Sequence, residues 1–204
     1  MLRTCTAEQF LKDAAGHRMT VKLDNGIYRH LVFKSPKDSW NMWFEVVTWP
    51  GCLCLHGDMG TWTFSRVEDM FTFFREDDLK INPGYWSEKL QAGTGCEGME
   101  MSKEFDAEEF KTRVLEMLGQ HFDVAEDTLK EATEALEEAW EYTHEGEHEL
   151  REAVYEFRFG AFQFDPMYIP QGKVWSYHFL WSCYAVVWAI QQYDAAHKEV
   201  PSVA

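Results

Sequence analysis

Turn-forming residues divide the stretch from residue 17 to residue 65 into short segments of strand composition. This pattern restricts the possible folds more than any other feature of the sequence. The expected strands are residues 17–23, 27–34, 42–49, 52–56 and 61–65. Asp24-Asn25-Gly26 between the first two has the chemistry of a tight hairpin turn. Such short links favour antiparallel neighbours, because parallel strands need a long crossover. The sequence therefore predicts an antiparallel meander of about five strands.

Helical patterns flank this sheet. A helix is predicted over residues 6–15, started by Thr6. A second is predicted over residues 66–77, where Ser65 and Glu68 have the spacing of a capping box. Both are expected to pack on the sheet.

The second half of the chain has helical periodicity throughout. Residues 81–100 contain Pro83 and several glycines, and we expect an extended loop there. Apolar residues then mark three amphipathic helices, followed by a last helix over residues 173–197 that is apolar almost all round. The expected fold class is α+β. Residues 1–100 would form the antiparallel sheet with flanking helices, and residues 101–204 an acidic helical region packed on it as one compact unit.

The negative charge of the chain is concentrated in one segment. The net charge is −16, and residues 97–152 hold 19 acidic and 5 basic residues. Residues 1–96, with 12 acidic and 11 basic residues, are almost balanced. The acidity is therefore a local feature of the helical region and not a general property of the surface.

The chain shows no sign of export or of membrane insertion. The N-terminal MLRTCTAEQFLKD has no apolar core of a signal sequence, and residues 174–190 are short for a membrane span and contain polar residues. Five cysteines, an odd number, indicate reduced thiols, and Cys52 and Cys54 lack the second pair that a zinc site needs. We expect a cytoplasmic protein without metal or cofactor.

A row of acidic residues lies on one face of the predicted helix over residues 127–145. At 100° per residue this face is opposite Leu129, Leu136 and Trp140. The row consists of Asp127, Glu131, Glu134, Glu138, Glu141 and Glu145. Neighbouring acids at this spacing repel by roughly 0.2–0.5 kcal/mol per pair. Two interpretations stay open, an ordinary solvated face and a surface that binds a basic partner.

His144-Glu145-Gly146-Glu147-His148 matches the H-E-x-x-H pattern of zinc peptidases. In those enzymes two histidines one helical turn apart bind the metal, and the glutamate acts as base. Gly146 lies where an unbroken helix is required, and no third ligand motif follows. We expect a chance match in a glutamate-rich run, and no catalytic residues.

Two further patterns have weaker functional interpretations. His56-Gly57-Asp58 is similar to a metallophosphoesterase turn but lacks the other blocks of that family, so a tight turn between strands is expected. The basic residues among the aromatic strands would suit single-stranded nucleic acid, but an ordinary mixed surface explains them as well. These bases are Arg18, Lys22, Arg29, Lys34 and Lys37.

Three stretches resemble a group of uncharacterised proteins from tailed bacteriophages and prophages of proteobacteria. They are RMTVKLDNGIYRHLVFKSP, WFEVVTWPG and GDMGTWTFSRVEDMFTFFR, between Arg18 and Arg75. The resemblance implies an accessory phage protein in a bacterial host cytoplasm, and it transfers no catalytic residue. By analogy, such proteins include acidic DNA mimics that inhibit host defence.

The sequence thus favours a non-enzymatic binding protein whose acidic row docks on a basic, nucleic-acid-binding host protein, such as a defence complex. It is not expected to bind nucleic acid or a membrane itself. The alternatives are a metal-dependent hydrolase using His144, Glu145 and His148, a phage structural or assembly protein, and a small-ligand binder. Self-association stays open.

Overall fold

The structure is a computed structural model that describes residues 4–37, 40–91, 98–121, 126–143 and 146–198. The described residues divide into two compact units, one within residues 104–174 and the other within residues 4–103 and 175–198. The last helix therefore belongs with the sheet, whereas the sequence grouped it with the acidic helices. Its residues are apolar almost all round, and the sheet offers the apolar face that can bury them. Among the described residues, no helix has the length and apolar character of a membrane span.

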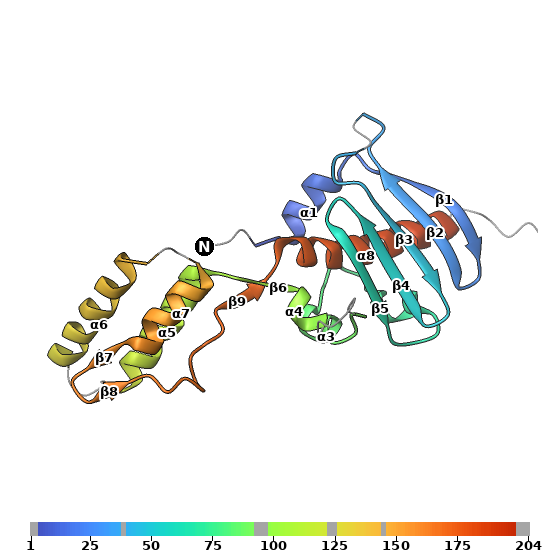
Figure 1. The fold of residues 1–204 in the computed structure, drawn as a ribbon. Coiled ribbons are helices and arrows are strands. Elements are labelled where there is room, and N and C mark those ends of the chain that lie inside the picture. The colour runs from blue at the N-terminus through green and yellow to red at the C-terminus, as the bar shows by residue number, and fades with distance from the viewer. Residues whose placement is uncertain (1–3, 38–39, 92–97, 122–125, 144–145, 199–204) are drawn as a thin grey trace, which may run out of the picture. The chain divides into compact units, whose positions relative to one another are not determined.

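The N-terminal half contains the predicted five-stranded antiparallel sheet, so the α+β class is confirmed (Figure 1). The strands are β1 (Arg18–Asn25), β2 (Tyr28–Lys34), β3 (Phe44–Trp49), β4 (Cys52–Gly57) and β5 (Gly60–Ser65). They pair in chain order with antiparallel registers. Gly26 adopts a φ of 62° in the first turn, a conformation that glycine accepts readily.

One face of the sheet carries the core of its unit. Alternate residues of the strands are buried there, namely Leu31, Phe33, Phe44, Val46, Leu53, Leu55, Trp62 and Phe64. Helix α8 (Tyr177–Lys198) lies against this face, and α1 (Ala7–Ala14) packs on α8 (Figure 1). Ten residues of α8 are buried, including Trp181, whose ring lies 5.0 Å from that of Phe10 in α1. Strand periodicity and an apolar helix thus produce a two-layer unit.

The short helices of this unit differ in part from expectation. Thr6 caps α1 as predicted. However, α2 spans only Met70–Phe74, and the side chain of Asp69 caps it by accepting a hydrogen bond from the amide of Phe71. The predicted capping box at Ser65 was therefore wrong, because β5 continues through Ser65. Nor is the following stretch only loop, since it contains α3 (Pro83–Ser87) and α4 (Gly98–Met101).

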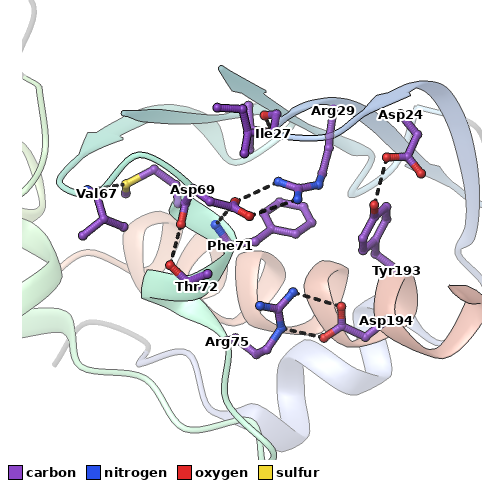
Figure 2. A network of polar contacts seen from close by, with 12 residues as sticks. Asp24, Ile27, Arg29, Val67, Asp69, Phe71, Thr72, Arg75, Tyr193 and Asp194 are labelled. Atoms are coloured by element: carbon purple, nitrogen blue, oxygen red, sulfur yellow. Dashed lines mark hydrogen bonds and ion pairs between the residues drawn. The ribbon is translucent and has the colours of Figure 1, made fainter. Parts of the chain in front are cut away.

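A buried ion pair joins strand β2 to helix α2 (Figure 2). Arg29 is only 7% exposed and binds both carboxylate oxygens of Asp69, at 2.8 and 3.1 Å. Its guanidinium also lies over the rings of Phe71 and Tyr193. Burial opposes ionisation of Asp69, but the hydrogen bonds from Arg29 and from the Phe71 amide outweigh it and lower the pKa of the carboxyl.

The unit within residues 104–174 contains three helices and a small hairpin. These are α5 (Ala107–His121), α6 (Glu126–Glu141), α7 (Glu147–Glu156), β7 (Arg158–Phe159) and β8 (Phe162–Gln163). They enclose a core of their own, made of Phe110, Val114, Leu118, Ala132, Leu136, Trp140, Leu150, Val154, Phe157 and Phe164. The three amphipathic helices predicted from the sequence are therefore present. Two further short strands, β6 (Lys103–Phe105) and β9 (Lys173–Trp175), pair with each other.

Candidate functional site

The predicted acidic row lies on the solvent side of α6. Its members within the described residues are all exposed, namely Asp127, Glu131, Glu134, Glu138 and Glu141. Ala132, Leu136 and Trp140 lie on the other side of the helix, in the core. Glu145, the sixth residue of the predicted row, lies outside the described residues. The helical pattern thus separates charge from core as the sequence indicated.

The acidic row has little compensating charge on its own helix. Lys130 approaches Glu134 to 3.9 Å, and both side chains are largely exposed, so this contact contributes little. By contrast, Arg113 on α5 binds both Glu109 and Glu116, at 2.9 and 3.2 Å. An ordinary solvated helix face has close ion pairs like those of Arg113, between residues three or four positions apart. The acidic row of α6 therefore presents a negative potential that the helix itself hardly neutralises.

Two hollows flank the C-terminal turn of α6, and carboxylates line both. The hollow between α5 and α6 has a volume of about 530 Å³. It is lined by Glu108, Lys111, Thr112, Leu115, Glu137, Trp140, Glu141 and Thr143. The hollow between α6 and α7 has a volume of about 420 Å³. It is lined by Ala139, Tyr142, Thr143, Glu149, Glu152, Ala153, Glu156 and Phe157.

Helix ends of both kinds meet at these hollows. The backbone carbonyls at the C-terminal end of a helix carry a partial negative charge, which favours nearby cations. The last turn of α6 contains no basic residue, and Glu137, Glu138 and Glu141 are exposed there. The first turns of α5 and α7, which bring Glu108 and Glu149 to the hollows, carry the opposite partial charge. The negative charge of the hollows therefore comes from their carboxylates.

Trp140 combines burial with an unused hydrogen-bond donor. Its side chain lines the α5–α6 hollow, yet the residue is only 6% exposed. Its Nε1 has no hydrogen-bond partner among the residues that the structure describes. The ammonium of Lys111 lies 5.9 Å from the centre of the Trp140 ring, at the outer limit of about 6 Å for a cation–π contact. Trp140 thus forms part of the wall of the hollow, while its Nε1 is enclosed by the protein.

The H-E-x-x-H pattern does not lie on one continuous helix. Helix α7 begins at Glu147, and Gly146 is its N-cap, so the pattern crosses a helix start. The imidazole of His148 is 85% exposed and lies 3.8 Å from Glu152. His144 and Glu145 lie outside the described residues. The part of the chain that the structure describes contains no group of three potential metal ligands.

His56-Gly57-Asp58 has a structural role at the end of β4. A Cβ at position 57 would overlap the carbonyl of Trp43, so the close approach of β3 requires glycine. The carboxylate of Asp58 accepts a hydrogen bond of 2.9 Å from the amide of Met42. The residues therefore form the tight connection between strands that the sequence predicted.

Two of the basic residues of the strands, Arg29 and Lys34, contact other side chains of the protein. Arg29 is buried in its ion pair with Asp69. Lys34 lies over the rings of Trp40 and Trp43, at 4.9 and 4.5 Å from their centres. These two cations already have partners within the protein, which weakens the case for a nucleic-acid surface on the sheet.

Sequence reasoning found the acidic row but missed the hollows. A helical wheel describes one helix, whereas each hollow is formed by side chains from two helices. Glu108, Glu137, Glu149, Glu152 and Glu156 were therefore not singled out, although they line the hollows. A sequence signal existed in the last turn of α6, where acids occupy positions at which basic residues are usual.

Comparison of the chain with models of protein families, with curated proteins and with solved structures found no significant match. The interpretation of the site therefore rests on its own geometry and charge.

Proposed function

We propose that the protein is a non-enzymatic binding protein whose acidic helical unit docks on a basic, nucleic-acid-binding surface of a host protein. The exposed acidic row of α6, whose contact with Lys130 is weak, carries this proposal. Electrostatic complementarity of this kind accelerates encounter and gives specificity, and it weakens as salt rises.

The distribution of charge supports docking by this unit. Residues 104–174 hold 19 acidic and 6 basic residues, a net charge of −13 out of −16 for the chain. Charge that serves only solubility can be spread over the whole surface and need not be concentrated in one compact unit. The concentration of negative charge therefore favours a specific basic partner.

The spacing of the acidic row also suits a groove that normally holds nucleic acid. With a helical rise of 1.5 Å per residue, the row has roughly one carboxylate per 5 Å. A DNA strand has about one phosphate per 3.4 Å. The array is sparser than DNA but has the same sign and scale. In this proposal the protein excludes DNA or RNA from its partner.

The resemblance of the sheet strands to phage and prophage proteins suggests which partner to seek. A phage accessory protein acts in a bacterial host, and nucleic-acid-binding defence complexes have basic grooves. We propose such a complex as the target. The hollows and acidic row need no reacting group for this role, since binding alone blocks the groove.

The test is affinity capture from a proteobacterial lysate, followed by measurement of affinity against salt for the captured partner. One variant changes four residues of the row to Gln, namely Glu131, Glu134, Glu138 and Glu141. A matched control changes four exposed acids of the sheet unit to their amides, namely Glu68, Glu76, Asp77 and Asp78. The row variant should bind more weakly with a shallower salt dependence, and the control should bind like the native protein. Identical curves for all three proteins would refute the proposal.

A further inference from the structure

We infer that the surface around the β7–β8 hairpin binds an aromatic side chain of the partner, in a segment where basic residues flank it. This inference rests on the proposed function and adds an apolar contact to it. Two hollows, the hairpin hollows, border this hairpin, with volumes of about 600 and 530 Å³. Both are lined by Phe162 and Gln163 of β8 and by His121 of α5. Their size is that of sites for small apolar groups, roughly 300–1,000 Å³.

The walls of the hairpin hollows are mainly aromatic and apolar. The ring of Phe162 contacts those of His121 and Phe164, at centre distances of 4.5 and 5.0 Å. Phe164 is only 4% exposed, so the core holds this wall in place. Among the described residues that line the two hollows, Asp165 alone has a carboxylate, which accepts a hydrogen bond from the Met167 amide. An apolar wall with few polar groups is typical of a site for an apolar group.

Exposed apolar side chains adjoin the smaller hairpin hollow. Tyr168 lines it and is 67% exposed, and the preceding Met167 is 83% exposed. Pro166 and Pro170 flank these two residues and restrict the backbone, so little conformational entropy is lost on binding. Tyrosine and methionine are enriched in protein interfaces, and contiguous exposed apolar surface often marks a binding site. This indication of a partner is independent of the charge of the unit.

The larger hairpin hollow borders the acidic row. Thr128 of α6 lines this hollow. Asp127 precedes Thr128 and Glu131 follows it one turn later, and both are exposed members of the row. Residues three positions apart on a helix are neighbours on its surface. One partner segment can therefore contact the hollow and the first carboxylates of the row together.

The charge of the unit determines which residues should flank the aromatic side chain. The net charge of residues 104–174 is −13, so lysine or arginine on both sides of the aromatic residue is complementary to it. Exposed charges accelerate encounter, whereas aromatic side chains in apolar sites provide much of the binding energy of protein interfaces. An acidic row alone would attract many basic proteins. The hairpin hollows would select among them those that present an aromatic residue.

The experiment uses two fluorescent peptides of equal charge, Lys-Lys-Gly-Phe-Gly-Lys-Lys and the same peptide with Ala in place of Phe. Both are titrated with the full-length protein at low salt. Tyr168→Ser removes a side chain from the wall of the smaller hollow. The matched control is Tyr155→Ser, because Tyr155 is 55% exposed in the same unit and lies outside the lining of both hairpin hollows.

We expect the native protein to bind the Phe peptide about tenfold more tightly than the Ala peptide. This factor corresponds to about 1.4 kcal/mol and is less than full burial of a Phe side chain provides, because the hollows are open to solvent. Tyr168→Ser should reduce the preference to about twofold or less, and Tyr155→Ser should keep it. Amide NMR spectra give a measurement that needs no variant. The Phe peptide, unlike the Ala peptide, should shift the amides of residues 160–165.

Equal binding of the two peptides by the native protein, or equal loss of preference in both tyrosine variants, would refute the aromatic site. A double variant with Glu131→Gln and Glu134→Gln tests the proposed function separately, since it should bind both peptides more weakly. Unchanged affinities in that variant would refute the role of the acidic row, whatever the preference for Phe. Sedimentation of the native protein alone tests a second copy as the occupant. A dimer that Tyr168→Ser dissociates would overturn the inference.

Discussion

The carboxylate of Asp24 in β1 lies 2.8 Å from Nε2 of His197, in the last turn of α8. The other ring nitrogen of His197, Nδ1, lies 2.8 Å from the carbonyl oxygen of Tyr193. Both neighbours are acceptors, so both hydrogen bonds form only when the imidazole carries two protons. Asp24 also accepts a hydrogen bond from the Tyr193 hydroxyl (Figure 2). This arrangement fastens the C-terminal end of α8 to the first strand of the sheet.

The first prediction is that this contact depends on pH. The bond to the Tyr193 carbonyl, followed by that to Asp24, raises the pKa of His197 above its usual value, and Asp194 acts in the same direction. A raised pKa means that the folded state binds the proton more tightly than the unfolded state. The stabilisation is therefore complete below the unfolded pKa of about 6.5 and is lost as pH rises through the folded pKa.

The measurement compares the melting temperature of the native protein with that of His197→Phe, which keeps a ring beside Tyr193. The native protein should be the more stable of the two at pH 5.5, and the difference should shrink by pH 8.5. Subtracting one melting temperature from the other cancels the pH dependence that comes from all the other titratable groups, because both proteins contain them. A difference that grows with pH would contradict the prediction.

The second prediction concerns the buried pair of Arg29 and Asp69. Asp69→Ala leaves the guanidinium of Arg29 buried without its counter-charge, and removes the cap of α2. Loss of one partner of a buried ion pair costs about 3–5 kcal/mol. We expect the lower end of this range in urea unfolding, because the Asp69 side chain is 26% exposed.

The control for this variant is the neighbouring pair of Arg75 and Asp194, whose side chains are 42% and 28% exposed. Asp194→Ala breaks an ion pair in the same network but in a wetter environment. It should reduce the free energy of unfolding by no more than about 1 kcal/mol. Similar losses for Asp69→Ala and Asp194→Ala would show that burial of Arg29 is not the source of the effect.

The third prediction contrasts two glycines. Gly57→Ala should destabilise the protein by about 1–3 kcal/mol, because the new Cβ overlaps the Trp43 carbonyl and forces β3 and β4 apart. Gly119→Ala, in α5, meets no atom within 4 Å and should stabilise its helix by about 1 kcal/mol. Chemical denaturation measures both. An equal effect of the two substitutions would mean that the contact with Trp43 relaxes at little cost.

The sequence predicted the sheet well because local chemistry determines it. The predicted turn at Asp24-Asn25-Gly26 lies slightly later, at Gly26-Ile27, because Asp24 and Asn25 pair within β1. This turn and the alternation of buried and exposed residues each involve neighbours along the chain. The predicted cap of α2 was wrong because it was inferred from a local pattern alone. Ser65 has the right spacing for a cap, but hydrogen bonding of β5 to β4 extends through Ser65, so Asp69 takes the role. Tertiary contacts override a local signal there.

The site was predictable only where one helix sufficed to define it. The acidic row follows from the period of α6 alone. The hollow between α5 and α6 brings Glu108 together with Glu137, which are far apart in sequence, and depends on how two helices pack. The missing acceptor of Trp140 likewise depends on every neighbour of its indole. Such features require coordinates, because periodicity contains no information on contacts between helices.

The last prediction concerns the stability of α6 without its partner. Changing Glu131, Glu134, Glu138 and Glu141 to Gln removes the repulsion between neighbouring carboxylates of the row, at roughly 0.2–0.5 kcal/mol per pair. These side chains are exposed, so the core of Ala132, Leu136 and Trp140 should be unaffected. The loss of the 3.9 Å contact between Lys130 and Glu134 should offset little of this gain, because exposed pairs contribute little.

Amide hydrogen exchange of peptides from α6 measures this effect locally, without interference from the sheet unit. In the variant, exchange in α6 should slow at low salt. Added salt screens the repulsion in the native protein and should bring the two exchange rates together. Peptides from β2 and β3 serve as internal controls and should exchange equally in both proteins. Faster exchange of α6 in the variant would show that the carboxylates stabilise the isolated helix, and the charge would then need no partner to explain it.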